Sequence, residues 1–173
     1  LVIMTPKSLL RHKLCVSNIS EFVSKSSFHR VLEDDAYNKK NNLVSLKKDN
    51  KIKKVVMCSG KIYYDLIEER EKTKNEDIVF VRLEQLYPFP AKTLARVLKK
   101  YKKAKFFWCQ EEPKNMGAWN TVRNYIERTL EMIYSEDINI KFVGRSASST
   151  TATGNANKHL AQQKEILEKI LKH

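Results

Sequence analysis

Glycine and proline are scarce in this sequence, with four of each among 173 residues. Neither GxGxxG nor GxxxxGK[ST] occurs, so the chain lacks the phosphate cradle typical of a stand-alone nucleotide enzyme. The three cysteines are widely spaced and form no CxxC pair, which argues against a disulfide framework and against a structural zinc site. The four histidines are also far apart, and no apolar run approaches the ~20 residues that span a membrane. We therefore expect a cytoplasmic protein with no membrane partner.

Positive charge is what the sequence has in excess: 33 Lys and Arg stand against 20 Asp and Glu, for a formal net charge of +13. Such a balance favours nucleic-acid binding as one hypothesis. However, 25 of the 33 cations are lysine, whereas arginine supplies the bidentate fork that recognises phosphates and base edges. We therefore expect solvated lysines and no nucleic acid as a partner, and keep a basic nucleic-acid-binding domain as an alternative.

The first 54 residues give a weak pattern. Leu1-Val2-Ile3-Met4 is a continuous apolar run that ends at Thr5-Pro6, which is typical of a buried strand and suggests a piece of a longer protein. Residues 28–33 can form a short strand. The stretch 36–54 is polar and lysine-rich, which predicts a solvated connection. Its central residues include Lys39, Lys40, Asn41 and Asn42.

From Val55 onward, apolar runs alternate with helical stripes. Residues 55–58, 78–81 and 106–109 are apolar throughout, and 138–143 alternate as in a half-exposed edge strand. Between them lie stripes that predict helices over 61–72, 94–101 and 119–133, with a closing helix over 160–170. Strands that are apolar throughout are covered by helices on both faces, as in parallel sheets. The sequence thus predicts an α/β fold, a three-layer doubly wound sandwich, with Cys58 and Cys109 as buried thiols.

Two features offer candidate chemistry. Glu111-Glu112 is a paired carboxylate of the kind used in acid/base catalysis. Adjacent side chains usually diverge, however, and a carboxylate before a helix stabilises its N-terminus, so we favour a structural role. The Ser/Thr-rich run 146–153 beside Arg145 is either an anion-binding loop or a connection to a helix that Thr153 or Asn155 caps.

Four segments, residues 2–12, 57–66, 81–90 and 108–119, resemble the C-terminal region of the 2-oxoglutarate dehydrogenase family, in the family's order. The resemblance implies a transketolase-like C-terminal domain, with a mostly parallel five-stranded sheet and one antiparallel edge strand, for which residues 28–33 are the candidate. It also implies that residues 1–12 are the tail of a preceding pyrimidine-binding domain, that 13–54 form a linker, and that 55–173 form the C-terminal domain.

The resemblance also implies the activity of the full-length protein, an oxidoreductase of the tricarboxylic acid cycle. Members of the family are homodimers that use thiamine diphosphate and Mg²⁺ to decarboxylate 2-oxoglutarate, and they transfer the succinyl group to lipoyl groups of the dihydrolipoyl succinyltransferase component. Their cofactor is held by earlier domains, the diphosphate and Mg²⁺ by a GDG…N motif. We therefore expect this chain to hold no catalytic, cofactor-binding or metal-binding residue, to be inactive alone, and to serve in assembly.

Carried over position by position, the resemblance assigns structural or interface roles to the loop after the third strand, at Gln110, Glu111, Glu112, Pro113, Asn115, Gly117 and Trp119. Some relatives bind a regulatory acyl-CoA, so an acyl-CoA-binding regulatory module is a further alternative. Its candidate residues are Arg82, Gln85, Lys92 and Arg145. The chain departs from the family at Ser146, where relatives usually have Pro, and at Ser149-Thr150-Thr151, which leaves the conformation of the loop 145–153 open.

Overall fold

The computed structural model of the chain describes residues 1–23, 25–38 and 43–172. Residues 39–42 of the lysine-rich stretch therefore lie outside the described residues. In chain order the strands and helices are β1 (Val31–Leu32), β2 (Lys54–Cys58), α1 (Ile62–Thr73), β3 (Ile78–Leu83), α2 (Ala91–Leu98), β4 (Lys105–Pro113), α3 (Trp119–Tyr134), β5 (Lys141–Arg145) and α4 (Ala156–Leu171).

The strands form one five-stranded sheet in the order β1-β3-β2-β4-β5. Strands β3, β2, β4 and β5 run parallel, whereas β1 pairs antiparallel with β3 and places Val31 opposite Leu83. The α/β fold with one antiparallel edge strand is therefore confirmed. The edge strand lies within the predicted 28–33.

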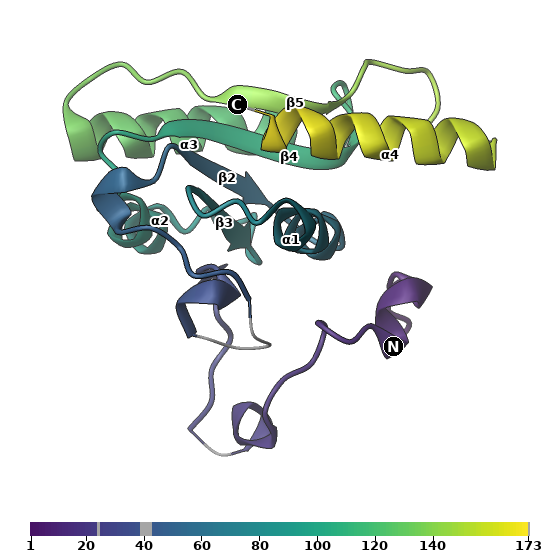
Figure 1. Cartoon of the computed structure of the whole chain (residues 1–173), viewed down its shortest axis with the longest axis horizontal. Coiled ribbons are helices and arrows are strands. Elements are labelled where there is room, and N and C mark those ends of the chain that lie inside the picture. The colour runs from purple at the N-terminus through teal and green to yellow at the C-terminus, as the bar shows by residue number, and fades with distance from the viewer. Residues whose placement is uncertain (24, 39–42, 173) are drawn as a thin grey trace.

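Helices cover both faces of the sheet and give three layers (Figure 1). Because side chains alternate along a strand, Val55 and Met57 of β2 pack with α2 and α3 on one face. Val56 and Cys58 pack with α1 and α4 on the other face. Both predicted buried thiols, Cys58 and Cys109, are fully enclosed, and burial raises the pKa of the Cys58 thiol to about 12.

Several bounds differ from the sequence prediction. The third strand was expected to end at Cys109, but β4 continues to Pro113. The edge strand expected over 138–143 is β5, which begins only at Lys141. The cap of the closing helix is the predicted Asn155, whose side chain accepts a hydrogen bond from the backbone N–H of Lys158.

The structure also departs from the expected solvated connection over 36–54. Ala36 and Ile52 are buried, and Asp34, just before this stretch, is completely enclosed. The Asp34 carboxylate accepts hydrogen bonds from the Arg70 guanidinium (Nη2 to Oδ1, 2.9 Å) and from the backbone N–H of Phe80 (2.8 Å). The expectation was wrong at Ala36 and Ile52, because the polar composition of a stretch does not reveal which of its few apolar side chains the fold encloses. The domain boundary after residue 54 stays a prediction.

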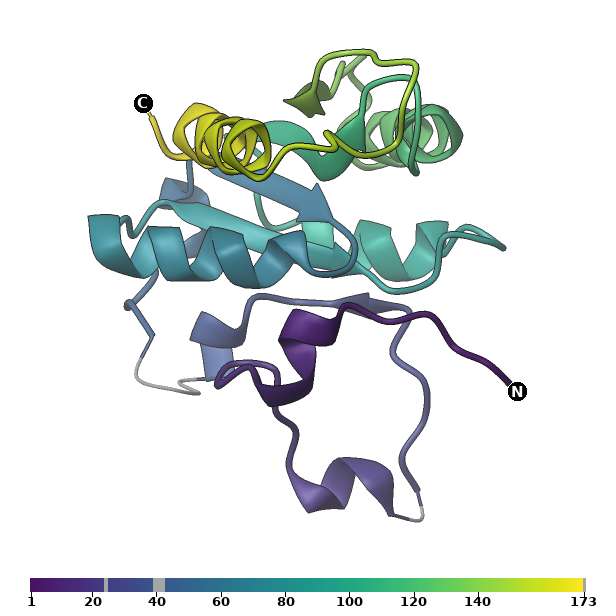
Figure 2. The ribbon, with the colours of Figure 1, turned by 90° about the vertical axis from the view of Figure 1, so that its right-hand side faces the viewer.

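The segment before β1 lies beneath the three layers as an extended arm (Figures 1 and 2). It contains two short 3₁₀ helices, Lys7–Arg11 and Ile19–Phe22. Leu9, Leu14 and Cys15 pack against the α1/α4 side of the core. Residues 1–4 form no strand and are exposed, so the buried strand expected there was wrong for this chain. A strand needs a neighbour to pair with, and no described segment supplies one.

Candidate functional site

Gln110 lies at the centre of the predicted structural residues. Its side chain is buried near the end of β4. Its Oε1 atom accepts hydrogen bonds from the Trp108 indole N–H (2.8 Å) and from the backbone N–H of Trp119 (3.0 Å). Its Nε2 atom donates to the carbonyls of Met116 (2.7 Å) and Pro113 (3.2 Å). One amide therefore fixes both ends of the loop between β4 and α3.

Two glycines allow this loop and β5 to approach Gln110 closely. Gly117 has φ +68°, and a Cβ there would lie 2.9 Å from Nε2 of Gln110. At Gly144, a Cβ would lie 2.9 Å from the backbone oxygen of Gln110 and 2.5 Å from the Phe142 ring. The same ring packs against Trp119, with 5.2 Å between the ring centroids. The predicted residues Gln110, Gly117 and Trp119 thus form one packed unit.

Glu111 and Glu112 do not form an acid/base pair. The half-buried Glu111 binds the ammonium group of Lys61 (Oε1 to Nζ, 3.0 Å), whereas Glu112 is exposed. Lys61 also binds Asp65 (Nζ to Oδ2, 2.7 Å). Burial opposes the charge on Lys61, but hydrogen bonds to Asp65 and Glu111 outweigh it and raise its pKa. Glu111 therefore links β4 to α1 and does not cap α3 as the sequence suggested.

Asn115 and Pro113 connect this region to the loop after β5. The Asn115 side chain donates to the carbonyl of Ser148 (2.9 Å) and accepts from its backbone N–H (3.0 Å). Pro113 lies opposite Arg145 in the β4/β5 pairing. The loop 145–153, whose conformation the sequence left open, is thus held by the β4/α3 loop.

A cavity of about 450 Å³ opens where the carboxyl ends of β2 and β4 meet. After β2 the chain continues to β3 on one side, and after β4 it continues to β5 on the other side. Open α/β sheets bind ligands at the point where the strand order reverses in this way. Among the described residues that line it, Glu112 is the only one with an ionisable side chain, and these residues offer no cation to an anionic ligand. Its lining includes Ser59, Gly60, Trp108, Gln110 and Gly117.

Among the candidate acyl-CoA residues, Arg145 lies apart from Arg82. The Arg82 guanidinium lies 4.1 Å from the centroid of the Tyr63 ring and 3.7 Å from a carboxylate oxygen of Asp35. Gln85 donates to the carbonyl of Pro88, and Lys92 is exposed on α2. Arg145 lies at the end of β5, with β2 and β4 between it and the strand that carries Arg82.

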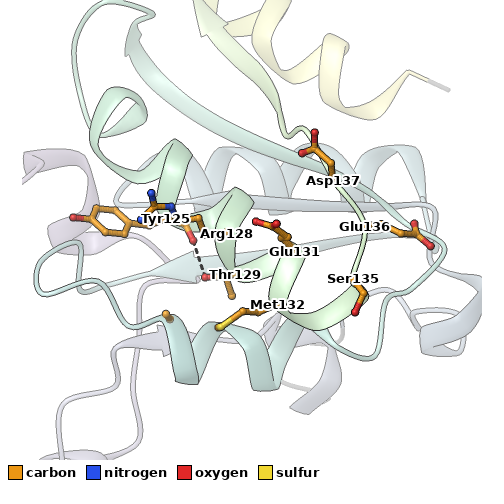
Figure 3. Close-up of a pocket in the computed structure, with 9 residues that line it drawn as sticks. Tyr125, Arg128, Thr129, Glu131, Met132, Ser135, Glu136 and Asp137 are labelled. Atoms are coloured by element: carbon orange, nitrogen blue, oxygen red, sulfur yellow. Dashed lines mark hydrogen bonds between the residues drawn. The ribbon is translucent and has the colours of Figure 1, made fainter.

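Another cavity, about 720 Å³, is an open groove along α3 and the turn that follows it (Figure 3). It mixes the exposed apolar side chains of Tyr125 and Met132 with charged groups. The charged side chains are Arg128, Glu131, Glu136 and Asp137. The Tyr125 ring stacks on Phe89 at 5.1 Å between centroids. The groove combines an apolar surface with a polar rim, which suits contact with a partner more than chemistry.

Several side chains of the kinds that hold metal ions have other partners in the described residues. In the described parts of the chain, His, Cys, Asp and Glu side chains form no group of three that could hold a metal ion. The carboxylates of Glu111 and Asp65 are both bound by Lys61. Two histidines have other partners, since His12 pairs with Glu68 (3.1 Å) and His159 with Arg145 (2.8 Å). Among residues 1–23, 25–38 and 43–172, no helix is long and apolar enough to cross a membrane.

Sequence reasoning did not single out Lys61, Asp34 or Arg70. Lys61 follows the apolar run of β2 and lies in the segment 57–66 that resembles the family. Its position there is the one indication of a role that the sequence offers. Asp34 and Arg70 are separated by 36 positions, and neither periodicity nor composition relates them.

A sequence profile of the family described as 2-oxoglutarate dehydrogenase C-terminal matches residues 16–171. The chain is 52% identical over 171 residues to the 2-oxoglutarate dehydrogenase E1 component of Brucella anthropi. It is 51% identical over 171 residues to the proteins of the same name from Brucella ovis and Brucella canis. Each match covers 99% of this chain and 17% of the relative, so the chain spans less than a fifth of the length of these curated relatives.

Proposed function

The chain belongs to the 2-oxoglutarate dehydrogenase C-terminal family, and from this premise we propose that it is the C-terminal assembly domain of such an enzyme. In this proposal the complete enzyme is a homodimeric oxidoreductase. It decarboxylates 2-oxoglutarate with thiamine diphosphate and Mg²⁺, and passes the succinyl group to the lipoyl groups of a dihydrolipoyl succinyltransferase. Residues 1–12 are the tail of the preceding domain, 13–54 the linker, and 55–173 the assembly domain.

Exposed apolar side chains on the arm before β1 carry the proposal. Contiguous exposed apolar surface marks an interaction site more often than isolated exposed residues do. Because Leu9, Leu14 and Cys15 already hold the arm on the core, its outer side chains are free to contact another part of the enzyme. The exposed set is Leu1, Val2, Ile3, Met4, Leu10, Val16, Ile19, Phe22, Val23 and Phe28.

The groove along α3 gives further support (Figure 3). Met132 is 71% exposed, and Tyr87, in the turn before α2, is exposed as well. This second exposed apolar surface, on the opposite face of the sheet from α1, suits a domain that contacts neighbours on more than one side. In the proposal, the unit around Gln110, Gly117 and Trp119 keeps the β4/α3 loop rigid for such contacts.

The proposal assigns catalysis to the earlier domains, and turnover tests it. Purified chain, shown to be folded by a cooperative thermal transition, is incubated with 2-oxoglutarate, thiamine diphosphate, Mg²⁺ and ferricyanide as electron acceptor. We expect no reduction of ferricyanide above the enzyme-free rate. The longer protein, extended upstream of Leu1, should reduce it under the same conditions. Turnover by the chain alone, or inactivity of a folded longer protein, would contradict the proposal.

A further inference from the structure

A small polar cavity lies between the end of β5 and the first turn of α4. Its volume is about 60 Å³. Two cations line it, Arg145 and Lys158, and none of its lining residues is acidic. The remaining lining is largely polar, with serine and threonine hydroxyls and Gln162. A cavity with two positive charges, several hydroxyl donors and no carboxylate attracts an anion.

The Arg145 guanidinium is held by His159, but one of its buried donor atoms has no hydrogen-bond partner among the described residues. Its Nη2 atom donates to Nδ1 of His159 (2.8 Å), which fixes the plane of the guanidinium. Its Nε atom is buried and has no hydrogen-bond partner among the described residues. A buried unpaired N–H costs free energy, which an acceptor in the cavity would recover.

The loop that surrounds the cavity is already held in place. Ser148 is fixed from outside by Asn115, at 2.9 and 3.0 Å. Ser148 Oγ in turn accepts from the backbone N–H of Thr150 (3.2 Å). The hydroxyls of Ser146 and Thr151 make no hydrogen bond within the described part of the chain and are available as donors. A preorganised loop loses little conformational freedom when a ligand binds.

We propose that this cavity binds one phosphate group through Arg145 and Lys158. Its volume admits a single tetrahedral oxyanion and excludes a nucleoside or sugar. The phosphate is either the free ion or the end of a larger molecule whose remainder stays outside. This site is separate from Arg82 and Gln85, and it does not depend on the assembly role.

Isothermal titration calorimetry of the folded chain tests the site, in a buffer without phosphate and at an ionic strength held constant with sodium chloride. The probes are inorganic phosphate and phenyl phosphate. Lys158→Gln should weaken phosphate binding at least about tenfold, the loss of one charge-assisted hydrogen bond, without lowering the melting temperature of the unliganded chain. The matched control is Lys164→Gln on the same helix, where the exposed lysine pairs with Glu168 (3.9 Å) and lies outside the cavity.

Arg145→Gln should abolish phosphate binding. If the Arg145→Gln variant does not fold, the Lys158→Gln variant still tests the proposal. Phosphate should also raise the melting temperature of the wild type, because it binds only the folded state. If phenyl phosphate binds as well as or better than inorganic phosphate, the ligand is the phosphate end of a larger molecule. If only inorganic phosphate binds, the ligand is the free ion. Absence of binding by both probes, or equal binding by wild type and Lys158→Gln, would overturn the proposal.

Discussion

Gln110 is the single side chain on which the β4/α3 loop depends most. Replacement by Leu, of similar size, would leave the Trp108 indole N–H, the Trp119 N–H and the Met116 carbonyl without their partner. Each buried unpaired group costs about 1–3 kcal/mol, so with three such groups we expect Gln110→Leu to lower the free energy of unfolding by about 3 kcal/mol or more. Urea unfolding followed by tryptophan fluorescence measures this loss.

Gln85→Leu serves as the control for that variant. The Gln85 side chain donates to the Pro88 carbonyl at the surface, and the loss of this hydrogen bond should change stability by less than about 1 kcal/mol. Equal effects of the two substitutions would show that the Gln110 network does not stabilise the loop.

Asp77 gives stability a defined dependence on pH. Its carboxylate is 5% exposed and binds Lys53 (3.0 Å) and Lys47 (3.3 Å). Burial raises its pKa, but the hydrogen bonds from Lys53 and Lys47 outweigh burial, so the pKa lies below the usual 3.8. The stabilisation is therefore present above the unfolded-state value and is lost as the pH falls through the lower folded-state value.

Asp77→Asn should consequently be less stable than wild type at neutral pH, and the difference should shrink below about pH 4. Urea unfolding between pH 7 and pH 3 measures it. Asp137→Asn, at an exposed carboxylate, should match wild type throughout. A difference for Asp77→Asn that stays constant or grows in acid would contradict the assigned ion pairs.

Among the elements, the apolar strands followed directly from the sequence. Runs such as Val55-Val56-Met57-Cys58 are buried on both faces, and composition alone indicates this. The end of β4 did not follow, because Gln110, Glu111 and Glu112 are polar residues whose strand conformation depends on partners elsewhere in the fold. An irregularity in the β4/β5 register between Cys109 and Pro113 accompanies that polar stretch. Periodicity in the sequence indicates which side chains are buried. It does not indicate a polar side chain whose hydrogen-bond partner lies far away along the chain.

The Asp34–Arg70 pair is one attachment of segment 31–38 to α1 and the sheet. Both side chains are completely buried, and Arg70 also donates to the carbonyl of Ile78 (3.2 Å). Asp34→Asn removes the buried counter-charge of Arg70 and leaves it the more distant carboxylate of Glu71 (Nε to Oε1, 3.6 Å), so we expect a loss of about 3–5 kcal/mol and release of β1. Urea unfolding gives the loss, and hydrogen exchange of the Val31 and Leu83 amides reports the release.

The control at this element is Glu33→Gln. Glu33 pairs with Lys100 at the surface, where such pairs contribute less than about 1 kcal/mol. An Asp34→Asn variant as stable as Glu33→Gln would mean that segment 31–38 is held by other contacts.

At the scale of the whole molecule, part of the large positive charge is paired with carboxylates at the surface. Along α4, Lys164 and Lys172 pair with Glu168, and Lys169 pairs with Glu165. The unusual surface is the apolar one. The apolar run of the first four residues predicts burial, since apolar runs usually are buried. These residues are exposed because the fold places nothing described over the arm. The arm is therefore the region where an assembly role is most directly tested.

The decisive measurement compares one double substitution in two proteins. Ile19 and Phe22 are 83% and 77% exposed, so Ile19→Asp with Phe22→Asp should leave the melting temperature of this chain unchanged. In the longer protein the same change buries two charges in an interface, and we expect a lower melting temperature and a smaller mass by light scattering. Ser17→Asp with Ser20→Asp, at exposed positions of the same arm, adds equal charge without removing apolar contact and is the control. A longer protein that keeps the mass and melting temperature of the wild type would contradict the assembly role.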